Sequence, residues 1–164
     1  MTERRGGDTY FLADHEHAEE ARRLQVVESC WDIYSQSRLE ALGLGPGAHC
    51  LEAGIGTGSM ARWMAEQVEP EGHVIGVDID DRFFHLLADS GVELRKADIR
   101  TIEIADRSLD FIHARLLLMH LSDREEVLST FARWLKPGGW LAVVDVDFSF
   151  DVRTEGRMGQ LFAD

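Results

Sequence analysis

The stretch HCLEAGIGTGSMARWMAE, residues 49–66, joins a short apolar run to a helical pattern through three alternating glycines. Gly54, Gly56 and Gly58 carry no Cβ atom, so the backbone can adopt positive φ angles and a ligand can lie directly against the main chain. The free N–H groups at the start of the following helix point toward whatever is bound. The stretch therefore predicts a nucleotide-like ligand at a strand-to-helix turn.

The sequence on either side of this turn alternates between strand-like and helix-like patterns. The strand-like segments are HCLEA, HVIGVDI, VELRKAD, LDFIHARL and WLAVVDVDF, and the helix-like segments are SMARWMAEQV, DRFFHLLADS and REEVLSTFARWL. Alternation of this kind favours parallel strands joined by right-handed helical crossovers. We therefore expect an α/β fold with a doubly wound, mostly parallel, Rossmann-like sheet.

A helical lead-in is expected before the first strand. Apolar side chains recur at steps of three and four residues from Leu24 to Tyr34, Asp14 can cap this helix, and Gly43 would stop it. The expected organisation is a helical lead-in at residues 1–45, a ligand-binding α/β domain at residues 46–150, and the start of a further segment at residues 151–164.

Composition and charge restrict the class of partner. The 164-residue chain is 45% hydrophobic, which suits one soluble core, and its 30 acids against 17 bases give a formal net charge of −13. Nucleic acid is disfavoured because binding to a phosphate backbone needs a basic face. The absence of an apolar run of about 18 residues or a signal-like start gives no support for a membrane span or export. Cys30 and Cys50 suggest neither a disulfide framework nor a metal site, and a cytoplasmic location is expected.

Most of the polar residues that could bind a ligand follow the carboxyl ends of the expected strands. In an open parallel sheet the ligand crevice lies outside these ends, where the strand order reverses. The successive ends carry Glu52 with the glycines, then Asp78 and Asp80, then Asp98, and finally His113, Ala114 and Arg115. We expect these side chains to converge on one cleft.

The glycine spacing departs from the dinucleotide-binding fingerprint G-x-G-x-x-G. In GIGTGS the third glycine comes one residue early, and Ser59 stands where the fingerprint has glycine. The carboxylate of Glu52 would also repel a pyrophosphate, whereas it would attract a ligand with a cationic amino group. A nicotinamide-dependent oxidoreductase is therefore a disfavoured alternative, and we expect a ligand without phosphates.

Taken in order, these motifs resemble those of the class I S-adenosylmethionine-dependent methyltransferases, and the opening YFLADHEHAEEARRL…RLEALGLGPG is similar to the lead-in helix of bacterial small-molecule methyltransferases within that class. LEAGIGTG is similar to the glycine-rich first motif of that family, VIGVDID to its second-strand acid, KADIRTIEI to its adenine-binding motif, SLDFIHARLLLMHL to its fourth strand, and LKPGGWLAVVD to the approach to its fifth. The resemblance spans residues 49–147. It implies that the chain binds S-adenosylmethionine, or its product S-adenosylhomocysteine, in a Rossmann-like domain.

The resemblance implies roles for the residues at the first two strand ends. Glu52 would contact the amino end of the methionine part of the cofactor. Main chain would lie against the ligand at Gly54, Gly56, Thr57 and Gly58. Asp78 would accept hydrogen bonds from both ribose hydroxyls, because it sits at the end of its strand. Asp80, two residues further on, is the alternative acid and would otherwise cap the next helix.

The resemblance also implies roles at the third and fourth strand ends. Asp98 would accept a hydrogen bond from the adenine amino group, and Ile99 and Ile79 would cover the adenine ring. Arg115 would pair with the carboxylate of the cofactor. Each residue has a simpler alternative: Asp98 as a solvated acid, Ile79 as a core side chain, and Arg115 as half of a surface ion pair.

The catalytic machinery is less defined than the cofactor site. Alignment and desolvation supply much of the rate of an in-line methyl transfer, so no obligatory residue is implied. A base that titrates near neutrality would help an oxygen nucleophile, and His120 matches a position where the family often has a histidine. A loop-packing role is the alternative for His120, and His113, inside a strand, is disfavoured as a base. Asp145 and Asp147 are expected to be a solvated strand end without a metal.

The preferred function is methylation of a small organic acceptor. The fourth strand ends in HARL and not in the Asn/Asp-Pro-Pro-aromatic turn of amino-methylating nucleic-acid enzymes. The family's sheet has sixth and seventh strands beyond the point where this chain stops, so we expect a C-terminally short fold. Its fifth strand would then self-associate, through its exposed edge or through an exchanged element. A cofactor-binding fragment or module without turnover is the alternative function.

Overall fold

The computed structural model describes residues 17–146, so Asp14, Asp147 and the segment at residues 151–164 lie outside the described part of the chain. The elements in chain order are α1 (His17–Ala41), β1 (His49–Ala53), α2 (Ser59–Val68), β2 (His73–Asp78), η1 (Phe84–Leu87), β3 (Val92–Lys96), β4 (Leu109–Arg115), η2 (Leu118–His120), α3 (Arg124–Trp134) and β5 (Leu135–Val144). The five strands form one parallel sheet in the order β3-β2-β1-β4-β5. The expected α/β fold with a doubly wound parallel sheet is confirmed.

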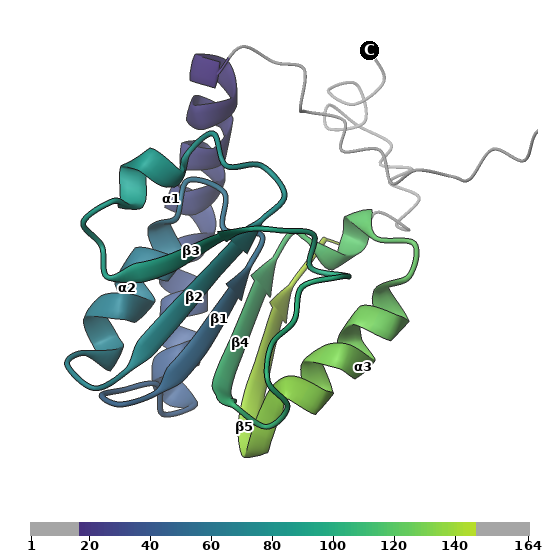
Figure 1. The fold of residues 1–164 in the computed structure, drawn as a ribbon. Helices are drawn as coiled ribbons and strands as arrows, with labels where there is room; N and C mark the ends of the chain where they lie inside the picture. The colour runs from purple at the N-terminus through teal and green to yellow at the C-terminus, as the bar shows by residue number, and fades with distance from the viewer. Residues whose placement is uncertain (1–16, 147–164) are drawn as a thin grey trace, which may run out of the picture.

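Helices cover both faces of the sheet (Figure 1). On one face, Leu39 of α1 and the methionines of α2 share an apolar core with Cys50 of β1. On the other face, Phe131 and Trp134 of α3 pack in a second core with Leu51. Successive strand residues point to opposite faces, so neighbouring residues of the buried β1 serve different cores. The long α1 contacts α2 and the sheet, and so the lead-in forms part of one layer of the fold.

The strand order reverses at β1, which pairs with β2 on one side and with β4 on the other. Glu52 lies opposite Gly76 of β2 and His113 of β4 in the strand register. Connections from β1 and β4 therefore leave toward opposite faces of the sheet and open a crevice at the carboxyl ends. This arrangement brings the strand ends singled out in the sequence to one place.

Two expected elements differ from the structure. The segment DRFFHLLADS forms only the short η1, in which Leu87 is buried and Leu86 is exposed, while Phe83 is buried just before it. The Leu87 carbonyl then accepts hydrogen bonds from the backbone N–H and the hydroxyl of Ser90, which end the turn. The last strand begins at Leu135 and not at Trp140, and a register irregularity opposite β4 accommodates the additional residues.

The remaining features concern the end of α1 and the search for a membrane-spanning helix. The lead-in helix ends as expected, since α1 stops at Ala41 and Gly43 adopts a φ of 92°. Within residues 17–146, no helix combines the length and the apolar character that a membrane crossing requires.

Candidate functional site

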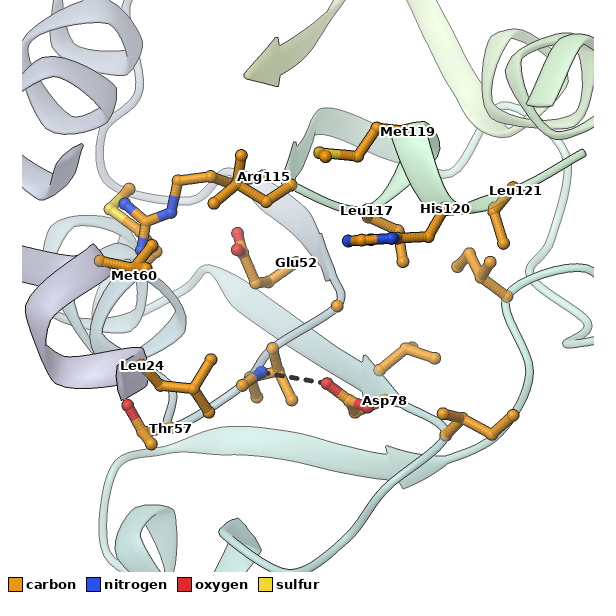
Figure 2. Close-up of a pocket in the computed structure, with 18 of the residues that line it drawn as sticks. Leu24, Glu52, Thr57, Met60, Asp78, Arg115, Leu117, Met119, His120 and Leu121 are labelled. Atoms are coloured by element: carbon orange, nitrogen blue, oxygen red, sulfur yellow. Dashed lines mark hydrogen bonds between the residues drawn. The ribbon is translucent and has the colours of Figure 1, made fainter. Parts of the chain in front are cut away.

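A cavity of about 460 Å³ lies at the carboxyl ends of the strands. Every expected site residue except Gly58 lines it, from Glu52 and Asp78 to Arg115 and His120. Figure 2 shows Glu52 and Arg115 on one side of the cavity, Asp78 on another, and His120 with Leu117, Met119 and Leu121 beyond them. The strand ends therefore meet at one cavity, but Asp80, His113 and Ala114, which were expected there too, are not among the residues that line it.

A hydrogen bond joins the glycine turn to Asp78 at the end of β2. The backbone N–H of Gly56, which has a φ of 55°, donates a hydrogen bond to Oδ2 of Asp78 at 3.0 Å (Figure 2). The N–H of Asp80 donates to the other oxygen, Oδ1, also at 3.0 Å. Burial raises the pKa of Asp78, and these backbone hydrogen bonds oppose that effect. The result is a fixed carboxylate at the wall of the cavity.

Asp80 is not among the residues that line the cavity. Its carboxylate pairs with the guanidinium of Arg82, and this hydrogen bond holds the pKa of Asp80 below its usual range. Asp80 also accepts a hydrogen bond from the backbone N–H of Arg82. Of the two acids considered in the sequence, only Asp78 lines the cavity.

Gly58 has a packing role. It precedes α2 with a φ of 90°, and a Cβ atom at this position would lie 2.3 Å from Cδ1 of Leu87. Leu87 is itself buried in the core beneath η1. Gly58 is therefore required because the turn packs closely against η1. The cavity is lined by the earlier part of the turn, at Gly54, Gly56 and Thr57.

The carboxylate of Glu52 is held from behind by a buried histidine. Nδ1 of His113 lies 2.7 Å from Oε2 of Glu52, and Nε2 of the same ring lies 3.1 Å from Oγ of Ser35 in α1. All three residues are buried. Sequence reasoning disfavoured His113 as a base, and the structure places it outside the cavity lining, in contact with the acid that faces the cavity.

The ends of β2 and β3 supply two isoleucines to the cavity lining, Ile79 and Ile99. Ile99 is buried, whereas the side chain of Ile79 is exposed on the cavity side. Both oxygens of Asp98 accept hydrogen bonds from the guanidinium of Arg100, and these bonds lower the pKa of Asp98. Asp98 is therefore half of an ion pair at the cavity rim.

The helix α1 supplies a wall of the cavity that sequence reasoning missed. Arg23, Leu24, Val27 and Glu28 line the cavity from this helix. The hydroxyl of Thr57 donates to the carboxylate of Glu28, so the helix is joined to the glycine turn. The spacing of three and four residues was visible in the sequence, but it indicated only that the helix would pack on another element.

His120 ends the short η2 and lines the cavity among apolar neighbours. The backbone N–H groups of Leu117 and Met119 donate to the carboxylate of Asp145, whose pKa is raised by burial. Asp145 therefore holds the loop that carries His120. Among residues 17–146, no group of three or more His, Cys, Asp or Glu side chains is arranged to hold a metal ion.

Comparison with known proteins identifies the family. A family model described as a methyltransferase domain matches residues 51–143, which is more than half of the chain. The chain belongs to the class I S-adenosylmethionine-dependent methyltransferases. The solved structure of such a methyltransferase from Aquifex aeolicus aligns with a TM-score of 0.61 and 25% identity, over 67% of this chain and 62% of that chain.

Curated relatives of this chain are named for different acceptors. Phosphoethanolamine N-methyltransferase 1 of Arabidopsis thaliana is 32% identical over 113 residues, which cover 65% of this chain and 23% of that protein. Demethylmenaquinone methyltransferase of Listeria welshimeri is 31% identical over 109 residues, covering 60% of this chain and 45% of that protein. The chain thus spans less than half of the length of these two relatives.

Proposed function

We propose that this methyltransferase binds S-adenosylmethionine in the cavity at the strand ends and methylates a small, uncharged organic acceptor. The observation that carries the proposal is the placement of two carboxylates, Glu52 and Asp78, on either side of exposed main chain at Gly54 and Gly56 around one cavity. A cationic amino group and a ribose diol are the two parts of the cofactor that carboxylates recognise.

The residues of the cavity fit the cofactor along its length. Glu52 would take the amino group, Asp78 the ribose hydroxyls, and Ile79 and Ile99 the faces of the adenine ring. Asp98 already accepts hydrogen bonds from the backbone N–H and the guanidinium of Arg100, so the adenine amino group would have to replace one of these donors.

Arg115 has enough donors to bind both Asp32 and the carboxylate of the cofactor. Its Nη1 donates to Asp32, while a guanidinium carries five N–H donors. We assign one of the remaining donors to the carboxylate of the cofactor. In this assignment Arg115 joins the cofactor to α1 through Asp32.

The acceptor would enter beside His120. When bound, the cofactor supplies an electrophilic methyl group. The chain contributes alignment and exclusion of water, for which Leu117, Met119 and Leu121 form an apolar surround. In this proposal His120, which lines the cavity, would accept the proton of an acceptor hydroxyl.

The charges around the cavity support an acceptor without a phosphate. Its three arginines each have an acidic partner within the protein: Arg23 pairs with Glu20, Arg100 with Asp98, and Arg115 with Asp32. A phosphate at this cavity would therefore have to share a guanidinium with an acid of the protein and, at Arg115, also with the carboxylate of the cofactor. Of the two relatives compared above, the one named for demethylmenaquinone therefore offers the closer guide to the acceptor than the one named for phosphoethanolamine.

A transfer assay tests this proposal. The protein is incubated with methyl-labelled S-adenosylmethionine and with quinols, phenols and phosphoethanolamine as separate acceptors. We expect label in a quinol or phenol and formation of S-adenosylhomocysteine. Cofactor binding without transfer to any of these acceptors would favour the alternative of a binding module, and preferential labelling of phosphoethanolamine would contradict the proposed acceptor class.

A further inference from the structure

We propose that His113 is a positioning residue: anchored by Ser35 of α1, it holds the Glu52 carboxylate in the orientation that receives the amino group of the cofactor. The inference rests on the proposed function, which places that amino group at Glu52. It adds a buried histidine and a helix residue, both outside the cavity lining, to the recognition of the cofactor.

The register of the sheet creates the contact between the two side chains. Glu52 of β1 and His113 of β4 are direct cross-strand partners, on the two strands between which the strand order reverses. Neighbouring side chains on one face of a sheet lie within contact distance. The face they share is the one that α1 covers, which is why Ser35 of that helix reaches the far side of the imidazole.

The hydrogen-bond partners suit one arrangement of protons. With the proton on Nδ1, the ring donates to Oε2 of Glu52 and accepts the hydroxyl proton of Ser35 at Nε2. Both ring nitrogens then have a partner in a site that excludes water. Since an unpaired polar group in such a site is costly, the three side chains hold one another in place.

The chemistry of this arrangement points to a role beyond packing. Phe111, two residues earlier in β4 and on the same face, is apolar and buried, and an apolar side chain at position 113 would extend that core without the cost of burying polar groups. Glu52 is held through Oε2 from behind, while the residue lines the cavity in front. An ionised carboxylate with one such bond keeps acceptor positions for a cationic ligand.

The test compares two ligands that differ at the relevant end. S-adenosylhomocysteine carries the amino group, whereas 5′-methylthioadenosine has the same adenosine thioether without the amino-acid part. Dissociation constants for both are measured by calorimetry for the wild type, His113→Leu, His113→Asn and Ser35→Ala. The Asn variant keeps an N–H donor near the position of Nδ1 but cannot reach Ser35. Asp78→Asn is the reference for a loss at the ribose, which both ligands share.

We expect His113→Leu to weaken S-adenosylhomocysteine about tenfold and 5′-methylthioadenosine less than about twofold, because only the former uses the oriented carboxylate. His113→Asn should recover part of the difference, and Ser35→Ala should show the same selective loss to a smaller degree. Asp78→Asn should weaken both ligands. If His113→Leu does not fold, the selective loss in Ser35→Ala and its absence in Asp78→Asn decide the question.

Three results would overturn the inference while leaving the proposed function intact. These are an equal loss for both ligands in the His113 and Ser35 variants, unchanged affinity for S-adenosylhomocysteine in them, or an Asn variant no better than Leu. Failure of the wild type to bind either ligand would instead overturn the proposed function, and the inference with it.

Discussion

One oxygen of Asp32 in α1 accepts hydrogen bonds from two other elements: Nη1 of Arg115, at the end of β4, lies 2.7 Å from Oδ1, and Oγ of Ser59, at the start of α2, lies 3.1 Å from the same atom. The Arg115 side chain is only 9% exposed. The contact therefore ties the helix that walls the cavity to the sheet and to the helix that follows the glycine turn.

Replacing Asp32 by alanine should lower the free energy of unfolding by about 1–3 kcal/mol, because it leaves the guanidinium of Arg115 partly buried without its carboxylate. Asp81→Ala is the matched control, since Asp81 pairs with Lys96 at the exposed surface and should cost less than about 1 kcal/mol. Chemical denaturation followed by circular dichroism measures both. Equal effects would show that the Asp32 contact contributes no more than a surface ion pair.

Gly58→Ala should destabilise the protein more than Gly43→Ala. Both glycines have a φ near 90°, so both variants carry the same backbone strain, but the added methyl group meets Leu87 at position 58 and open space at position 43. Overpacking of a core side chain costs about 1–3 kcal/mol beyond the shared strain. Urea denaturation of the two variants checks the difference, and indistinguishable midpoints would contradict the packing role of Gly58.

The affinity for S-adenosylhomocysteine should fall on acidification at a higher pH than for an ordinary aspartate, because burial raises the pKa of Asp78 and only its ionised form accepts both ribose hydroxyls. The pH dependence of folding stability in the ligand-free protein has the opposite sign, so acidification increases the contribution of Asp78 to stability. The contribution of Asp78 to stability is complete below the unfolded pKa and is lost as the pH rises through the raised folded value.

Titrations with S-adenosylhomocysteine across this acidic range measure the effect on affinity. Asp78→Asn should bind more weakly at neutral pH and lack the step, because it has no carboxyl group to protonate. A step of the same size in wild type and Asp78→Asn would assign the titration to another group.

The edge of β5 should mediate self-association. In the described part of the chain β5 pairs with β4 alone, and Trp140 and Val143 expose large apolar side chains on this strand. Charged residues on edge strands oppose pairing with another chain. Val143→Lys should therefore lower the apparent mass in light scattering, while Val26→Lys, on the exposed side of α1, should leave it unchanged. A monomeric wild type would contradict this prediction.

Features that depend on local sequence patterns or on the general topology of the sheet could be predicted from the sequence. The helix α2 follows from the apolar spacing within SMARWMAEQV and begins and ends where that spacing does. The convergence of Glu52 and Asp78 follows from a general property of parallel sheets. These features depend on local patterns and on topology, which the sequence alone specifies.

Features that depend on tertiary contacts were not predicted from the sequence. The packing role of Gly58 depends on Leu87, which is 29 residues away, and the contact between His113 and Glu52 depends on the register of β4 beside β1. A histidine within an apolar strand was a visible signal, but nothing in the sequence specified its partner. The pairing of Arg115 with Asp32 likewise required the position of α1.

The central claim is that the carboxylates at the strand ends bind S-adenosylmethionine and its product. Calorimetric titration with S-adenosylhomocysteine and, separately, with NAD tests it most directly, using Asp78→Ala and, as control, Asp80→Ala, whose carboxylate pairs with Arg82 and does not line the cavity. We predict that S-adenosylhomocysteine binds and NAD does not, with a loss of about 1–3 kcal/mol in Asp78→Ala and little change in Asp80→Ala. Tight binding of NAD, or an unchanged affinity in Asp78→Ala, would contradict the account.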